Sequence, residues 1–594
     1  MTNKVFTIAT VMVPAVAAIA APTAGADTND RPGFWIDLGK ESGDITPWVN
    51  PEPEWPEEIR KREYTVVARP SFPVTFPTYM PLLKELGQPL RLTLAPGETG
   101  SAVIFVRSLS RKDMTLQLAV DETLRSKDGP FFGNYLSGAR SHYVRRAEQI
   151  KINSVFPGRP RYIRTPMYLL HTNRLSLKPY EAGQFWWTVE VPENTPPGEY
   201  TDFLIVKPVA GGNPEHQKPV RVNIVLTVRN LTLLESDAAF GVWFYFAERS
   251  NPPEMTLTQG PSTVIPGSED IYLADQRRHG MTTVAYYTQC EGTDRGGGVA
   301  VTFTEMDAAI EGIKRAGLCR TAPLVLLFRT FNRESGYMEF GNLRGGARTI
   351  MKVQQHAKEA DWPEILFTVF DEPGDDEKKT QIANRILQEY VEPRKKGVRT
   401  VVAYPNLKAH GHLYDVWIVR RQIGKDEWKN VHDLAKKHGA EVWMYDWNMG
   451  GRNPLLERFY AGLWTWRTGV KGNMVWCYGH YARISDRGLP QSKLAWEARL
   501  EGVNDYRYLH TLEKAIRSAE TAGNGDAAVK NARAFLKELE EKISLDAYGN
   551  LYNLESYLQK FFWNPVPAIA AEEYDSIRND CAGHIEAIQA LLKR

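Results

Sequence analysis

The chain lacks an excess of charge of either sign. Among its 594 residues, Lys and Arg number 73 and Asp and Glu number 71, which gives a formal net charge of +2. Proteins that bind nucleic acid or acidic membranes usually carry a positive excess, because their partners are polyanions. The charge balance therefore argues against nucleic acid as a partner.

Cysteines are few and widely spaced. The four positions are Cys290, Cys319, Cys477 and Cys581, and none belongs to a Cys-x-x-Cys pair. This spacing is compatible with two disulfides, one or none. Disulfides therefore do not define the fold.

Several signature motifs are also missing. The sequence contains no Gly-x-Ser-x-Gly elbow, no phosphate-binding loop and no His-Glu-x-x-His zinc motif. The segment His410-Gly411-His412 has no third metal ligand at a recognisable spacing, so we interpret it as part of a loop. We therefore expect no cofactor and no metal.

Long apolar runs are confined to the N-terminus. Lys4 precedes an apolar run over residues 5–21, and Ala24-Gly25-Ala26 then places small residues before a cleavage point. This is the pattern of a secretory signal peptide. A retained membrane anchor is the alternative, which the short run, interrupted by Pro14, disfavours. We expect residues 1–26 to be removed, no membrane span to remain, and the protein to be periplasmic, secreted or on the cell surface.

What the chain does have is enough apolar residues for a large core, at 43% of the total, and 16 Trp and 26 Tyr. After an N-terminal extension (27–62), residues 63–232 contain short β runs separated by turns such as Ala95-Pro96-Gly97-Glu98 and Thr195-Pro196-Pro197-Gly198. This rhythm predicts an antiparallel β-sandwich. We interpret it as a packing module in preference to a sugar-binding one.

From residue 233 to 512, short buried strands alternate with helical segments. Eight strands are predicted, over residues 239–246, 282–287, 324–327, 365–370, 400–403, 415–418, 441–445 and 473–477. Helices are predicted between them, over 271–280, 305–317, 347–360, 376–396, 428–439 and 455–468. Eight such units predict a (β/α)8 TIM barrel, followed by a helical C-terminal region over 513–594. A doubly wound open sheet is the weaker alternative, since no Gly-x-Gly-x-x-Gly turn follows a strand.

In a (β/α)8 barrel the reactive groups lie at the C-terminal ends of the strands. The fourth predicted strand is followed at once by Asp371-Glu372-Pro373. Two adjacent acids at this position predict a catalytic pair, with capping of the next helix as the alternative. Because Pro373 disfavours the α region for the residue before it, we expect Glu372 to be extended.

Aromatic and polar residues follow the other strand ends and are candidates for substrate binding. They are Tyr287, Tyr404, Asp446, Trp447, Asn448, Trp476 and Tyr478. Aromatic rings stack on sugar rings, so acids surrounded by aromatics predict glycoside hydrolysis.

The adjacency of the two acids bears on the mechanism. A usual retaining pair stands about 5 to 5.5 Å apart across the scissile bond and comes from different strands. Adjacent acids instead suit a substrate whose own 2-acetamido oxygen attacks the anomeric carbon, while one acid protonates the leaving oxygen and the other holds the acetamido N–H. Two alternatives remain: a retaining glycosidase with Glu372 as acid/base and Asp446 as nucleophile, and a non-catalytic glycan-binding surface protein.

The chain also resembles a known family. Asp371-Glu372-Pro373, Trp464-Thr465-Trp466, Gly472-Asn473-Met474-Val475-Trp476 and the segment from Trp496 to Tyr506 are similar to glycoside hydrolase family 123 and related bacterial domains. The resemblance covers roughly residues 60–510 and implies a β-N-acetylgalactosaminidase-like enzyme with retaining, substrate-assisted catalysis. It maps the family's catalytic pair onto Asp371 and Glu372. The helical region after about residue 524 is not part of the family pattern.

Overall fold

The computed structural model describes residues 43–45, 50–119, 142–154, 161–212, 218–244, 269–288, 292–295, 298–328, 330–331, 338–339, 346–368, 370, 372–374, 377–420, 423–446, 454–484, 488–523, 526–545 and 569–593. The predicted signal peptide, Cys290, Asp371, Trp447 and Asn448 lie outside these residues. No described helix is long and apolar enough to cross a membrane.

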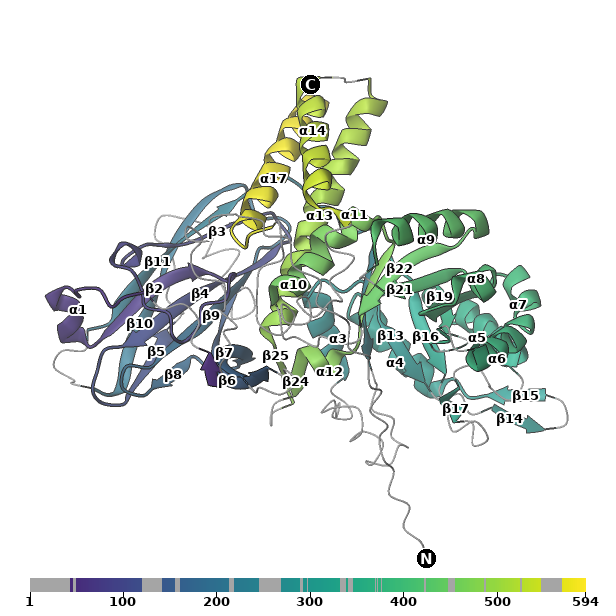
Figure 1. The fold of residues 1–594 in the computed structure, drawn as a ribbon, viewed down its shortest axis with the longest axis horizontal. Helices are drawn as coiled ribbons and strands as arrows, with labels where there is room; N and C mark the ends of the chain where they lie inside the picture. Colours follow the sequence, from purple (N-terminus) through teal and green to yellow (C-terminus); the bar gives the residue numbers. More distant parts are fainter. Residues whose placement is uncertain are drawn as a thin grey trace, which may run out of the picture.

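The N-terminal part of the chain forms two β-sheets that pack face to face (Figure 1). The first sheet has the strand order β1 (Gly43–Ile45), β7 (Arg161–Leu170), β6 (His142–Ser154), β9 (Ala182–Glu190), β4 (Thr99–Ser108) and β2 (Tyr64–Pro70). The second has the order β3 (Leu90–Leu94), β11 (Val220–Val228), β10 (Gly198–Gly211), β5 (Met114–Ala119) and β8 (Arg174–Leu177). Helix α1 (Glu57–Arg62) precedes β2.

Most strand pairs in these sheets are antiparallel, as predicted, but two are parallel: β1 with β7, and β3 with β11. The chain crosses from one sheet to the other at the predicted turn between β3 and β4, so β3 cannot pair with its successor in a hairpin. The Glu98 carboxylate accepts a hydrogen bond from the Ala95 N–H at 2.7 Å and closes this turn.

The first sheet is buried on both faces at β4 and β9. One face packs against the second sheet around residues such as Ile104, Phe185 and Trp187. The other face, with Phe105 and Trp186, packs against Leu494 and Ala498 of the helix that follows the barrel. The sheet therefore joins the sandwich to the rest of the chain through an apolar interface.

The central part is a closed barrel of eight parallel strands, as predicted. In order around the barrel they are β12 (Ala239–Phe244), β13 (Ala285–Thr288), β16 (Leu324–Phe328), β19 (Ile365–Thr368), β20 (Arg399–Ala403), β21 (Val416–Arg420), β22 (Glu441–Asp446) and β23 (Gly472–Val475). All eight coincide with predicted strands to within a few residues. The C-terminal ends of the strands therefore meet at one mouth, where TIM barrels place their reactive groups.

Helices cover the outside of the barrel. They are α3 (Glu269–Arg278), α4 (Thr304–Arg315), α5 (Gly346–Glu359), α6 (Glu377–Gln388), α7 (Val391–Lys395), α8 (Leu407–His410), α9 (Lys425–His438), α10 (Pro454–Phe459), α11 (Thr465–Thr468), α12 (Tyr478–Tyr481) and α13 (Leu494–Thr521). Short strand pairs lie in the loops: β14 (Gly292–Arg295) with β15 (Gly298–Val301), β17 (Thr330–Phe331) with β18 (Met338–Glu339), and β24 (Ala482–Ile484) with β25 (Pro490–Ser492).

Two predicted helices are interrupted. The helix predicted over 376–396 is divided into α6 and α7, because Pro393 has no N–H for an interior helical bond and lies in the first turn of α7. The helix predicted over 455–468 contains a π-helical turn (Tyr460–Trp464) between α10 and α11. At this turn Gly462 lies so close to α13 that a Cβ would be 2.7 Å from the carbonyl oxygen of Gly502. Only glycine allows this approach.

The C-terminal region forms α14 (Ala527–Lys542) and α17 (Glu573–Leu592), which pack on the long α13 and project from the barrel (Figure 1).

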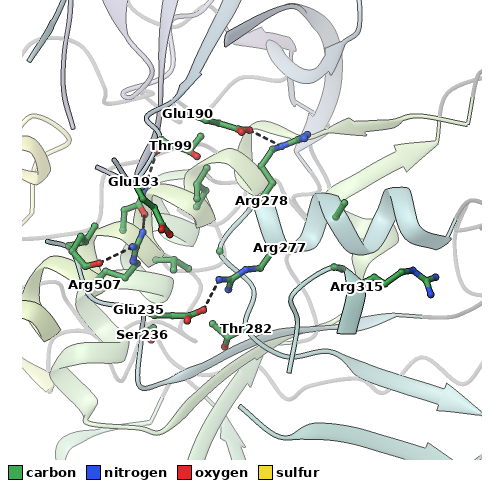
Figure 2. Close-up of a pocket in the computed structure, with 18 residues that line it drawn as sticks. Thr99, Glu190, Glu193, Glu235, Ser236, Arg277, Arg278, Thr282, Arg315 and Arg507 are labelled. Carbon is green, nitrogen blue, oxygen red and sulfur yellow. Dashed lines mark hydrogen bonds and ion pairs between the residues drawn. The ribbon is translucent and has the colours of Figure 1, made fainter. Parts of the chain in front are cut away.

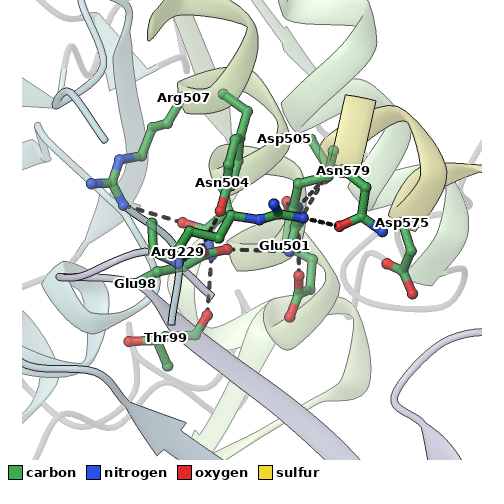
Figure 3. Close-up of polar contacts among 12 residues, drawn as sticks. Glu98, Thr99, Arg229, Glu501, Asn504, Asp505, Arg507, Asp575 and Asn579 are labelled. Atoms are coloured by element: carbon green, nitrogen blue, oxygen red, sulfur yellow. Dashed lines mark hydrogen bonds and ion pairs between the residues drawn. The ribbon is translucent and has the colours of Figure 1, made fainter. Parts of the chain in front are cut away.

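A buried charge network fixes α17 at its base. Arg578 donates to Glu98 Oε1 of the sandwich at 3.3 Å and to Glu501 Oε2 and Asp505 Oδ1 of α13 at 2.8 and 2.6 Å. Arg458 of α10 donates to Asp505 Oδ2 at 2.7 Å. Glu98, Glu501 and Asp505, labelled in Figure 3, are the three carboxylates that pair with Arg578, so one network joins sandwich, barrel and tail.

A second buried network surrounds His279, at the end of α3. Its Nδ1 lies 2.8 Å from the Asp275 carbonyl oxygen, its Nε2 lies 3.1 Å from Glu497 Oε1 of α13, and its ring stacks on Trp496. Burial alone would lower the pKa of His279, but the carboxylates of Asp275 and Glu497 outweigh it and raise the pKa. The ring therefore lies between two buried carboxylates that favour its protonated form.

The raised pKa predicts a stability that depends on pH. The contribution of His279 to the free energy of unfolding is fully present below the ordinary histidine pKa of about 6.5 and is lost as the pH rises through the raised folded-state pKa. Denaturant unfolding at a series of pH values measures the free energy of unfolding of the wild type and of His279→Gln. The difference between the two free energies should become smaller as the pH increases. His432→Gln, which removes a ring bonded to the Thr468 carbonyl, is the control. A difference independent of pH would contradict a charged His279.

Candidate functional site

Five aromatic side chains line the mouth of the barrel and form what we call the aromatic cup: Trp243, Tyr287, Tyr404, Tyr445 and Trp476. They come from the C-terminal ends of β12, β13, β20, β22 and β23. The ring centroids of Trp243 lie 5.0 Å from Tyr445 and 6.1 Å from Trp476. Tyr287 lies 6.1 Å from Trp476, and Tyr404 lies 4.6 Å from Tyr445. The rings therefore form one continuous cluster, in which Tyr404 and Trp476 are partly exposed and the other three are buried.

Glu372 lies beside this cup. It follows β19, is exposed, and accepts a hydrogen bond on Oε1 from the hydroxyl of Tyr445. The Lys379 ammonium donates to the Glu372 carbonyl oxygen at 3.4 Å. The predicted acid thus lies at the barrel mouth, in direct contact with an aromatic residue of the cup.

The backbone at Glu372 differs from the predicted extended form. Its φ is +41°, in the left-handed region, and Tyr404 at the end of the next strand has φ +47°. The two turns are joined, because the Gly374 N–H donates to the Tyr404 carbonyl oxygen at 3.0 Å. Pro373 excludes the right-handed helical region for Glu372 but does not force it to be extended, and this bond between strand ends selects the left-handed form. Such conformations cost about 1–3 kcal/mol each and cluster at functional sites.

The other predicted site residues are placed differently. Asp446 is the last residue of β22, where it pairs with Val475, and nothing is described of its side chain. Asp371, Trp447 and Asn448 lie outside the described residues. Tyr478 is in α12, away from the cup: its hydroxyl donates to Asp275 Oδ2 at 2.8 Å, in the interior between α3 and α13. The structure therefore brings Glu372, Tyr287, Tyr404 and Trp476 together, and Tyr478 packs in a separate cluster.

Two residues of the mouth were missed by sequence analysis. Tyr445 holds Glu372, and Arg420, at the end of β21, places its guanidinium 4.8 Å from the Tyr404 ring centroid. A signal for Arg420 exists in the sequence, since Val416, Ile418 and Arg420 alternate along one face of the strand. A charged residue that ends the inner row of a barrel strand is a functional candidate.

The contact with Tyr445 predicts that this residue positions Glu372. Tyr445→Phe keeps the ring and removes only the hydrogen bond to the carboxyl group, so we expect kcat to fall about tenfold to a hundredfold. If Glu372 is the acid that the sequence predicts, the loss should be larger for glycosides with poor leaving groups, which depend most on protonation. Tyr506→Phe is the matched control, because it removes a tyrosine–carboxylate bond to Asp237 outside the cup. Equal losses for good and poor leaving groups would assign Tyr445 a purely structural role.

A cleft of about 530 Å³ lies at the opposite end of the barrel, between the sandwich, α3, α4 and α13 (Figure 2). None of the described residues that line it is aromatic. Two of its arginines are paired: Arg277 with Glu235 at 2.7 Å and Arg278 with Glu190 at 2.9 Å. The cleft therefore has the character of an ion-paired seam between sandwich and barrel.

Metal and thiol chemistry receive no support from the described residues. They contain no group of three or more His, Cys, Asp or Glu side chains that could hold a metal ion. Cys319, Cys477 and Cys581 are buried free thiols in this part of the chain. Burial raises the pKa of Cys319 and of Cys477 to about 11, which keeps both thiols protonated and unreactive.

Comparison with solved structures supports the fold in one case. No family model and no curated protein sequence matches the chain. A family 123 glycoside hydrolase from Clostridium perfringens superposes with a TM-score of 0.57 at 11% identity, over 89% of this chain and 100% of that chain. A family 39 glycoside hydrolase from Bacteroides cellulosilyticus (TM-score 0.33, 12% identity, 69% and 81% covered) and a Bacteroides ovatus GH5 xyloglucanase (0.30, 11%, 70% and 98%) superpose too weakly to add to this. The chain therefore has a fold similar to that of a family 123 glycoside hydrolase, as the sequence resemblance implied.

Proposed function

We propose that the protein is a glycoside hydrolase that cleaves terminal β-linked 2-acetamido-2-deoxy sugars, of the N-acetylgalactosamine type, with retention. The observation that carries the proposal is Glu372, held by Tyr445 at the rim of an aromatic cup in a barrel mouth. The similarity in fold to a family 123 glycoside hydrolase supports it. The sugar would stack on the rings of the cup and present its glycosidic oxygen to the carboxyl group.

In the proposed mechanism the acetamido oxygen of the substrate attacks the anomeric carbon, and the bond to the leaving oxygen breaks. Glu372 gives its proton to that oxygen, and Asp371 holds the acetamido N–H and stabilises the positive charge of the oxazolinium intermediate. Glu372 then removes a proton from the water that opens the ring. The Tyr445 hydroxyl occupies Oε1 of Glu372, which leaves Oε2 to carry the transferred proton.

A panel of chromogenic β-glycosides with and without the 2-acetamido group tests the proposal. The N-acetylated galactoside should be turned over far faster than the plain β-galactoside, and a thiazoline analogue of the intermediate should inhibit. Asp371→Asn should lower turnover much more than Asp446→Asn. A sugar trapped on Asp446 by a 2-fluoro glycoside would establish the two-carboxylate mechanism instead, and binding of glycans with no hydrolysis of any substrate would leave a glycan-binding protein.

Export is part of the proposal, because polymeric and surface glycans are found outside the cytoplasm. If the N-terminal segment is a signal peptide, the mature chain begins at about Asp27. N-terminal sequencing of exported protein tests this, and an intact Met1 would favour a membrane anchor.

A further inference from the structure

Arg420 lies on the inner face of the barrel mouth. It ends β21, whose residues Val416 and Ile418 contribute to the barrel interior, and it pairs in register with Tyr445 of β22. Side chains alternate between the two faces of a strand, so Arg420 continues the inward row. The side chain is exposed.

The guanidinium of Arg420 contacts the ring of Tyr404. Its Cζ lies 4.8 Å from the centroid of that ring, a cation–π contact, which uses none of the N–H donors in a hydrogen bond. The five N–H donors point outward in the plane of the guanidinium. Within the part of the chain that the structure describes, Arg420 has no hydrogen bond and no carboxylate partner. Among the described residues, this cation at the mouth thus has hydrogen-bond donors that no other side chain uses.

Arg420 is connected through two tyrosines to Glu372, the residue that would protonate the glycosidic oxygen. Tyr404 contacts Arg420, its ring centroid lies 4.6 Å from that of Tyr445, and Tyr445 bonds to Glu372. The cation and the carboxyl group are therefore linked through these two tyrosines. A substrate bound with its glycosidic oxygen at Glu372 would cover the guanidinium and displace the water that solvates it. A neutral substrate would provide no negative charge to compensate for that loss of solvation.

We propose that Arg420 binds an anionic group of the substrate, a carboxylate or a sulfate, at the mouth of the aromatic cup. This inference rests on the proposed function and narrows its substrate class to acidic or sulfated glycans that contain a 2-acetamido sugar. The fork of an arginine can bind two oxygens of one oxyanion at once, whether these belong to a planar carboxylate or to a tetrahedral sulfate. The anion is either a sulfate on the cleaved hexosamine or the carboxylate of a neighbouring uronic acid.

Matched substrates distinguish the two sources. One pair is an aryl β-N-acetylgalactosaminide with and without a 6-sulfate; the other is N-acetylgalactosamine β-linked to glucuronic acid or to glucose. We expect the wild type to prefer the anionic member of at least one pair in kcat/KM. Arg420→Gln should lower that preference about tenfold to a hundredfold, the loss of a charge-assisted hydrogen bond, and Arg420→Lys should lower it less. Added salt should weaken the preference of the wild type.

Arg483→Gln is the matched control, since Arg483 also stacks on a tyrosine, Tyr168 at 4.2 Å, but lies outside the cup. It should keep the wild-type preference. If the wild type cleaves the neutral hexosaminides and prefers neither anion, the inference is wrong and the proposed function stands. If it cleaves no hexosaminide, the proposed function is wrong. In that case, calorimetry with N-acetylgalactosamine 6-sulfate and with glucuronic acid tests whether Arg420 binds anions independently of hydrolysis. Binding to the wild type that is lost in Arg420→Gln supports an anion site, and the absence of binding to the wild type overturns it.

Discussion

Replacing Glu372 with Gln is expected to lower turnover of substrates with poor leaving groups by about 10²- to 10⁴-fold, the usual contribution of a general acid. The amide of glutamine cannot supply the proton that the departing sugar oxygen needs. Aryl glycosides with strongly acidic phenols should lose far less in the step that breaks the bond, because such groups leave without protonation. Steady-state kinetics with a series of aryl glycosides measures this. The dependence of turnover on the acidity of the leaving phenol is compared between wild type and variant.

The variant should fold normally. Glu372 is exposed, and an amide oxygen can still accept the hydrogen bond from Tyr445. Glu377→Gln is the matched control, because Glu377 is exposed in the first turn of α6, five residues further on, and has no contact with the cup. Near-wild-type turnover of a natural β-hexosaminide by Glu372→Gln would remove Glu372 from the role of acid.

The barrel could be predicted because its strands are short, apolar and separated by helices, so their number alone decides the architecture. The identity of the side chains that line its mouth was harder to predict, because a shift of one residue along a strand moves a side chain to the other face. At the end of β22 the sequence pointed to Asp446, of whose side chain nothing is described, and not to Tyr445, whose hydroxyl bonds to Glu372. Arg420 was missed because β21 extends two residues beyond the predicted end of its strand at residue 418.

Tyr478 illustrates a different limit. It stands only two residues after Trp476, which belongs to the cup, but α12 begins at Tyr478 and turns its side chain toward Asp275 of α3. That partner is 203 residues away in the chain. No local pattern around Tyr478 encodes such a contact, because it depends on how α3 and α13 pack outside the barrel.

The same holds for the buried charges that join the three parts of the molecule. Glu98 comes from a sandwich turn, Glu501 and Asp505 from α13, and Arg578 from α17, and each is buried. Burial disfavours the charge of Arg578, but the carboxylates of Asp505, Glu501 and Glu98 outweigh it and raise the pKa of its guanidinium well above the usual value. Along the sequence, Arg578 resembles any other charge on an amphipathic helix. Its role follows only from the three carboxylates that surround it.

Arg578→Met is therefore expected to lower the free energy of unfolding by about 3–5 kcal/mol, because it leaves buried carboxylates without their partner. Denaturant unfolding followed by tryptophan fluorescence measures the loss. Glu98→Gln should cost less, since Arg578 keeps Glu501 and Asp505. Arg533→Ala is the control: it breaks an exposed pair with Glu520 on the tail, and exposed pairs contribute at most about 1 kcal/mol.

The pH dependence of the Arg578→Met variant separates lost charge pairing from lost packing. Burial already raises the pKa of Glu501, and removing Arg578, one of the cations that oppose this shift, raises it further in the folded state. Between the pKa of Glu501 in the unfolded chain and its raised pKa in the folded variant, the folded variant binds more protons than the unfolded chain. Its stability therefore increases as the pH falls through this range. The difference from the wild type should accordingly be smaller at pH 5 than at pH 8. A loss of the same size at both values, or one no larger than that of Arg533→Ala, would mean that α17 is held to the sandwich by apolar contacts and that the buried charges contribute little.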